Sequence, residues 1–134
     1  MPRYTNMCEL RWSDMDANGH MNNAVYSTYL EDTRFRMFSQ LVPKDPAERL
    51  RSNFVVSEQT LKFVRALVYR EEPVTVEAWV EDVKSVSFTV CCEIKDGDDV
   101  YITSRSLMVS YDSIVNRPRR LSEHERSVIT AFAA

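Results

Sequence analysis

The spacing of hydrophobic and polar residues changes along the chain, and each change predicts an element. Residues 4–13 mix polar and apolar positions as strands do. From Asn23 to about Leu41, apolar residues recur every three or four positions, which predicts one long helix ending before Pro43. A short helix should follow, capped by Asp45, which precedes a proline, and should end near Asn53.

The long predicted helix has one broad apolar face. That face comprises Tyr26, Tyr29, Leu30, Met37, Phe38 and Leu41. The charged residues are expected mostly on the other faces, and these are Glu31, Asp32, Arg34 and Arg36. Core packing is the expected role of the aromatic residues, including Phe35, although they could also line an acyl pocket.

Beyond the short helix the apolar spacing falls to two residues, which is typical of strands. It predicts four strands in series, joined by links of hairpin length, at residues 54–64, 74–81, 88–94 and 100–113. Asp96-Gly97 is a tight hairpin signal, and Ser122 with Glu125 forms a capping box that predicts a short C-terminal helix. The order indicates an α+β domain, an antiparallel sheet packed on one helix.

Composition narrows the class of protein. The 134 residues suggest a single domain, 1–134, and a net charge of -3 gives no electrostatic case for nucleic acid or for an anionic membrane. No apolar run approaches a membrane span, and the first residues lack an apolar signal core, so we expect a cytoplasmic protein. The three cysteines, two of them adjacent, are expected as free thiols, and no C-x-x-C pair suggests zinc.

The stretch DMDANGHMNNAVY, residues 14–26, concentrates the candidate chemistry. Its first half matches a calcium loop, but such a loop needs a glutamate six residues after the glycine, where this chain has Val25. We therefore expect no metal site. A second interpretation is structural, because Asp and Asn favour turns and helix caps and Gly19 can supply a positive φ.

The third interpretation of this stretch is catalytic. A helix N-terminus exposes unpaired N–H groups and a partial positive charge, which can polarise a carbonyl oxygen and stabilise an oxyanion. Asp16 lies seven residues before the expected helix start at Asn23, and its carboxylate could attack that carbonyl or activate water. Asn18 and His20 add groups that can orient substrate or water. Acyl transfer would then need neither a serine nor a cysteine nucleophile.

A resemblance favours the catalytic interpretation. Residues 11–34, RWSDMDANGHMNNAVYSTYLEDTR, resemble the hotdog-fold thioesterases, in particular the 4-hydroxybenzoyl-CoA thioesterase-like group. They are also similar to the D-x-N-x-H-x-N-N signature of acyl-ACP thioesterases, which matches this chain position for position at Asp16, Asn18, His20, Asn22 and Asn23. The remaining elements agree in order, but only this motif is specific.

The resemblance implies a sheet wrapped around one long central helix, with the active site at the interface of a homodimer or homotetramer. It implies hydrolysis of an acyl-CoA or acyl-ACP thioester without any cofactor, CoA being part of the substrate. Asp16 would be the nucleophile or general base, and a backbone N–H near Asn23 would polarise the thioester carbonyl. Asn18 and His20 would take accessory roles. An exposed sheet edge also favours a dimer.

One departure and two alternatives bear on this assignment. The acyl-ACP enzymes carry a further acidic residue in the strand after the helix, where this chain has Ala66, which favours the acyl-CoA type. Hotdog hydratases and dehydratases use D-x-N-P-x-H, whereas no proline follows Asn18 here. A non-catalytic acyl-CoA-binding protein is the other alternative, although Asp16 is present. Glu31 is expected to be a structural or interface group, and the NRPRR cluster from Asn116 a solvated basic loop.

Overall fold

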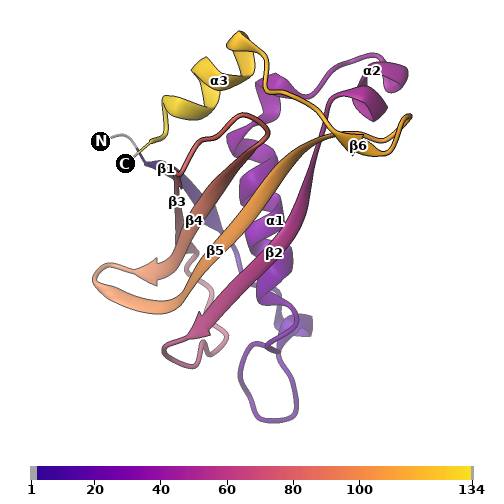
Figure 1. Ribbon diagram of the computed structural model, residues 1–134. Helices are drawn as coiled ribbons and strands as arrows, with labels where there is room; N and C mark the ends of the chain where they lie inside the picture. Colours follow the sequence, from indigo (N-terminus) through magenta and orange to yellow (C-terminus); the bar gives the residue numbers. More distant parts are fainter. Residues whose placement is uncertain (1–2, 134) are drawn as a thin grey trace.

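The computed structural model describes residues 3–133, which form one curved sheet and one long helix that lies against its concave face (Figure 1). In chain order the elements are β1 (Tyr4–Cys8), η1 (Trp12–Asp14), α1 (Tyr26–Met37), η2 (Ser39–Leu41), α2 (Pro46–Arg51), β2 (Asn53–Phe63), β3 (Val74–Glu81), β4 (Ser87–Asp96), β5 (Asp99–Asp112), β6 (Arg117–Pro118) and α3 (Glu123–Thr130). Among these residues, no helix is long and apolar enough to cross a membrane.

The sheet is antiparallel, as predicted, but its strand order differs from the predicted series. The order is β1-β3-β4-β5-β2, with the two-residue β6 beside β5. The chain leaves β2 through a ten-residue connection, 64–73, and crosses to β3 near the opposite edge. The prediction of hairpin-length links was therefore wrong for this step. As a result β2 is an edge strand, paired along its length with β5 and interrupted by a bulge between Val56 and Glu58.

The helix α1 is shorter than predicted. It begins at Tyr26 and not Asn23, because residues 23–25 form a turn, and it ends at Met37, after which residues 39–41 form a 3-10 turn. The first strand is shorter too, ending at Cys8, because Trp12–Asp14 winds into the 3-10 turn η1. The later start of α1 arises within the motif, where the Asn22 side chain accepts a backbone N–H from Ala24.

The face that α1 buries also differs from the prediction, at Thr33, Arg34 and Phe35. Thr33, which was not part of the expected apolar face, is fully buried. Leu30 is fully buried, but Arg34, one turn later on the same face, is also buried, with only 8% of its surface exposed. Phe35 was expected in the core and is instead 61% exposed. The expected apolar face has no member between Leu30 and Met37. Because Arg34 follows Leu30 by four residues, helical spacing alone places it on that face.

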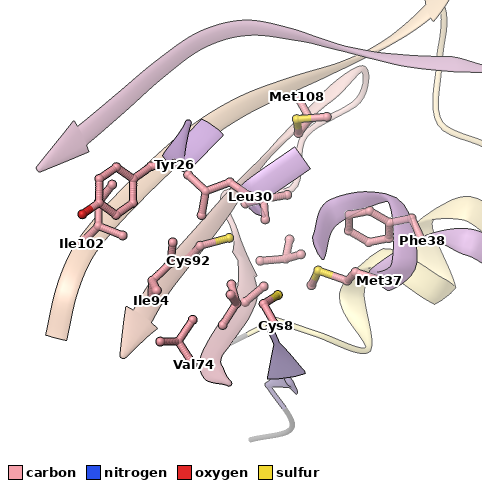
Figure 2. Close-up of a cluster of buried hydrophobic side chains, with 14 of the residues drawn as sticks. Cys8, Tyr26, Leu30, Met37, Phe38, Val74, Cys92, Ile94, Ile102 and Met108 are labelled. Atoms are coloured by element: carbon pink, nitrogen blue, oxygen red, sulfur yellow. The ribbon is translucent and has the colours of Figure 1, made fainter. Parts of the chain in front are cut away.

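The core fills the space between α1 and the sheet (Figure 2). Tyr26, Leu30 and Met37 of α1, together with Phe38 directly after it, meet alternate residues of the strands, among them Cys8, Val74, Cys92, Ile94, Ile102 and Met108. Replacing a fully buried leucine such as Leu30 by alanine would cost about 2–5 kcal/mol. On β5, three small polar residues also face this space, and they are Ser104, Ser106 and Ser110.

The local signals for the turns and caps were correct. Asp96 and Asp99 are paired across a two-residue loop in which Gly97 has φ +57°, the left-handed value that suits glycine. The Ser122–Glu125 capping box opens α3, and the Asp45 side chain accepts a hydrogen bond from Ala47 N–H at the start of α2. These contacts are local in sequence, which is why the sequence predicts them well.

Candidate active site

The segment between β1 and α1 folds into a small hairpin loop, residues 14–22, which projects from one end of the molecule (Figure 1). Its two sides are joined by backbone hydrogen bonds from Asn22 N–H to Asp14 O at 3.0 Å and from Asp16 N–H to His20 O at 2.9 Å. Met15 and Met21 form an antiparallel bridge between these two bonds. The base of the loop is therefore ordered, and its tip is exposed to solvent.

Asp14 anchors this base. Its carboxylate, 6% exposed, accepts a fork of hydrogen bonds from Arg11 Nε and Nη2, at 3.1 and 3.0 Å, and a further bond from the Tyr29 hydroxyl on α1. Burial acts to raise the pKa of Asp14, but the hydrogen bonds from Arg11 and Tyr29 outweigh it and lower that pKa below its ordinary value. The contacts fit a loop-structuring role, and Tyr29, expected in the core, is part of this polar anchor.

Asp16 opens the tip of the loop. One of its carboxylate oxygens accepts the backbone N–H of Asn18 at 2.9 Å, and its carbonyl accepts Gly19 N–H at 3.0 Å. Gly19 has φ +76°, so the predicted need for a positive φ is confirmed. Asp16 is half-buried, whereas Asn18 and His20 are exposed. Asp16, Asn18 and His20 thus lie within one five-residue turn, as the sequence suggested.

The chain enters α1 through Asn22 and Asn23. The side chain of Asn22 accepts Ala24 N–H at 2.9 Å, and its carbonyl accepts Val25 N–H at 2.9 Å. Asn22 therefore caps the turn that leads into the helix. The backbone N–H of Asn23 makes no hydrogen bond within residues 3–133, and Asn23 is exposed. A free donor thus lies at the positive end of α1, three residues earlier than the first helical residue.

Other residues singled out in the sequence lie away from this loop tip. Ala66 lies three residues beyond the end of β2, in the connection to β3, so the expected position in a strand is wrong. In the basic cluster, Arg117 and Arg120 are exposed, but Arg119 forms a fork with Glu125 at 2.7 and 2.6 Å. Only part of that cluster is a solvated loop.

The cysteines are all free and buried. Burial raises the pKa of Cys91 to about 11 and of Cys92 to about 12, so both are thiols at neutral pH. Within residues 3–133, no three His, Cys, Asp or Glu side chains gather as metal ligands would. The chemistry available at the loop is therefore that of carboxylate, imidazole, amide and backbone N–H.

A cavity of about 370 Å³ lies at the other end of α1, between its last turns and the beginning of β2. Its walls are mostly apolar and include Phe38, Leu41, Phe54, Val56 and Met108. Arg34 also lines it, with Nη1 donating to Gln59 Oε1 at 3.2 Å and to Ser106 Oγ at 3.3 Å. Sequence reasoning missed this residue, although its spacing from Leu30 was a signal that could have found it.

Comparison with known proteins defines the class. The model of the thioesterase-like superfamily matches residues 10–128. A protein from Bacillus stearothermophilus described as a predicted thioesterase superposes with a TM-score of 0.89 at 24% identity, over 99% of this chain and 98% of that one. A thioesterase from Thermus thermophilus, solved with coenzyme A and zinc, gives 0.80 at 24% identity over 96% and 97%. A DHNA-CoA thioesterase from Staphylococcus aureus gives 0.78 at 19% identity over 95% and 86%.

These likenesses, together with the curved antiparallel sheet around α1, define a hotdog fold. The chain belongs to the thioesterase-like superfamily, whose model covers most of its length. Membership supports thioester hydrolysis as its general chemistry. No protein with a curated description matches the chain in sequence.

Proposed function

We propose that the protein hydrolyses an acyl-CoA thioester to the free acid and CoA, with Asp16 as the reacting carboxylate. The observation that carries the proposal is that two groups lie at the same end of α1. Asp16 is half-buried on an ordered turn, and the Asn23 N–H is a donor without a partner in the described residues. A carboxylate and a preorganised donor are the two groups that acyl transfer requires.

The steps follow from these two groups. The Asn23 N–H donates a hydrogen bond to the thioester oxygen and, aided by the partial positive charge of the α1 N-terminus, stabilises the negative charge that develops there. Asp16 then either attacks the carbonyl carbon, expelling the CoA thiolate and leaving an anhydride that water hydrolyses, or removes a proton from the attacking water. Asn18 and His20 orient the water or the substrate. The thiolate takes up a proton as it leaves.

The proposed working unit is a dimer formed through β2. This edge strand has β5 as its only strand neighbour within residues 3–133, and apolar side chains along it and on the adjoining flank of α1 are exposed. They are Phe35, Val56, Phe63 and Val64. If two copies pair β2 with β2 antiparallel about a two-fold axis, the N-terminal end of each α1 lies beside the C-terminal end of the other.

Acyl-CoA is preferred over acyl-ACP as substrate because of what two structural neighbours bind or act on. One structural neighbour was solved with coenzyme A and another is a DHNA-CoA thioesterase, both with this fold. Parallel thiol-release assays with one acyl group on CoA and on acyl-carrier protein would test this preference, and a higher kcat/KM on the carrier protein would overturn it.

The test of the chemistry is the Asp16→Asn variant in a thiol-release screen over short, long, branched and aromatic acyl-CoAs. We expect kcat to fall by about 10³-fold with the melting temperature preserved. Asp98→Asn is the matched control, since Asp98 is an exposed acid in the β4–β5 turn and should keep full activity. Near wild-type hydrolysis by a folded Asp16→Asn protein would overturn the mechanism.

The two roles of Asp16 can be separated by single-turnover hydrolysis in H₂¹⁸O, followed by mass spectrometry of the protein. Label retained on the peptide containing Asp16 indicates the anhydride route, because water attack on the anhydride can leave its oxygen on the enzyme. Label found only in the released acid shows that water attacked the acyl carbon, either directly with Asp16 as base or on the acyl side of the anhydride, so label on the enzyme is the result that distinguishes the two roles.

A further inference from the structure

The cavity at the C-terminal end of α1 contains a buried charge with no opposite charge against it. Arg34 is 8% exposed, and its two hydrogen-bond acceptors, Gln59 and Ser106, are both neutral. Among residues 3–133, no carboxylate lies within 4.0 Å of its guanidinium. Burying an unpaired charge is costly, so such a group normally has a partner.

The guanidinium has donors to spare. Of its three nitrogens, only Nη1 makes hydrogen bonds, to Gln59 and Ser106. These two acceptors are bonded to each other, because Ser106 Oγ donates to Gln59 Oε1 at 2.8 Å. Nε and Nη2 make no hydrogen bond within residues 3–133. They are nevertheless not among the side-chain atoms that are both completely buried and without a hydrogen-bond partner. Both therefore keep some accessible surface, and the cavity that Arg34 lines is the space next to it. Two adjacent N–H donors match the two oxygens of a carboxylate.

The other charged groups of the cavity do not neutralise Arg34. Glu31 lines the rim, but its side chain is exposed, where water screens its charge. Arg49 also lines the cavity, and it is held by the carbonyls of Pro43 and Lys44 at 2.7 and 3.0 Å. Arg34 is thus the one buried charged group among the residues that line the cavity.

We propose that this cavity binds the acyl group of the substrate and selects one with a carboxylate at its far end, which pairs with Arg34. This rests on the proposed function, and in the proposed dimer the cavity would face the partner subunit's Asp16. A volume of about 370 Å³ is near the lower limit for ligand sites, which suits a short acyl chain. The substrate class is the CoA thioester of a short dicarboxylic acid.

The first test compares thiol release from adipyl-CoA and hexanoyl-CoA, which differ only in the terminal group. The wild type should prefer adipyl-CoA in kcat/KM by about 100-fold, because hexanoyl-CoA leaves Arg34 unpaired. Arg34→Met should abolish the preference by lowering kcat/KM for adipyl-CoA to the level of hexanoyl-CoA. Arg34→Lys, which keeps the charge without the fork, should retain part of it. A wild-type preference for hexanoyl-CoA, or an unchanged preference in Arg34→Met, overturns the proposal.

The second test needs no turnover and no Arg34 variant. Calorimetry should detect binding of free adipate, but not of hexanoate, to the Asp16→Asn protein. Equal or absent binding of the two acids overturns the proposal, even if thioesters are hydrolysed. Conversely, adipate binding by a protein that releases thiol from no thioester supports the cavity assignment and rejects the proposed function. The two failures are therefore distinguishable.

Discussion

The two ends of α1 differ in almost every physical property. At its N-terminal end a polar loop holds Asp16 on an exposed turn fixed by backbone hydrogen bonds. At its C-terminal end an apolar cavity contains the buried Arg34. Twelve helical residues, about 18 Å, separate the two ends. The difference suggests that reacting groups and acyl-binding groups are divided between the ends, so that one chain supplies two half-sites and a complete site needs two chains.

The largest expected effect comes from mixing two variants, Asp16→Asn and Arg34→Met, each of which should hydrolyse adipyl-CoA poorly. If each site combines one chain's loop with its partner's cavity, subunit exchange creates a heterodimer with one intact site. Half of the dimers would then carry one of two sites, which restores about a quarter of wild-type activity. Thiol release before and after exchange measures it.

The matched control is each variant exchanged with itself, which should recover nothing. If a chain used its own cavity, every heterodimer site would still carry one substitution, and the mixture would stay inactive. Sedimentation of the mixture should show dimers, because only dimers can exchange subunits and combine one chain's loop with the other chain's cavity.

A smaller loss is expected from Val64→Asp, which places a charge on an apolar residue just beyond β2. The dimer should weaken by about tenfold or more, because a charge at an edge disfavours pairing, and activity should fall with it. Val115→Asp is the control, since Val115 is similarly exposed at the β5–β6 turn. Sedimentation equilibrium checks both, and equal dimer constants for the two variants would remove β2 from the interface.

Asp14→Asn should affect the loop base more than the chemistry. Losing the charge weakens the bonds from Arg11 and Tyr29, and about 1–3 kcal/mol of unfolding free energy should be lost at neutral pH. Because the folded-state pKa of Asp14 is lowered, its contribution is present above the unfolded pKa, about 3.9, and is lost as pH falls through the folded value. Denaturant unfolding of wild type and variant should therefore converge at low pH, whereas a constant difference would contradict this.

The smallest effects come from the two glycines with positive φ. Gly19→Ala and Gly97→Ala should each cost about 1 kcal/mol, because a side chain disfavours the left-handed region. Only Gly19→Ala should also lower kcat, since Gly19 shapes the turn that holds Asp16, whereas Gly97 lies in the remote β4–β5 hairpin. Equal activities of the two variants would show that the turn does not position Asp16.

The sequence predicted features that depend on neighbouring residues, and it did not predict features that depend on contacts between distant segments. The roles of Gly19 and of the Ser122–Glu125 box depend on neighbours within a few residues, and the structure agrees with both. The place of β2 beside β5 depends on a crossover that no local pattern specifies. The prediction put Arg34 outside the buried face of α1. A buried arginine needs hydrogen-bond acceptors, and here they come from distant strands, as Gln59 and Ser106, which the local pattern does not reveal.

The unpaired edge of β2 has a consequence for how the protein would be measured. A site built across that edge exists only in associated chains, so mass action sets its abundance. Specific activity would then decline on dilution and recover on concentration, with no change in any single chain. An assay at nanomolar protein could record a poor enzyme where the same preparation, more concentrated, is a competent one.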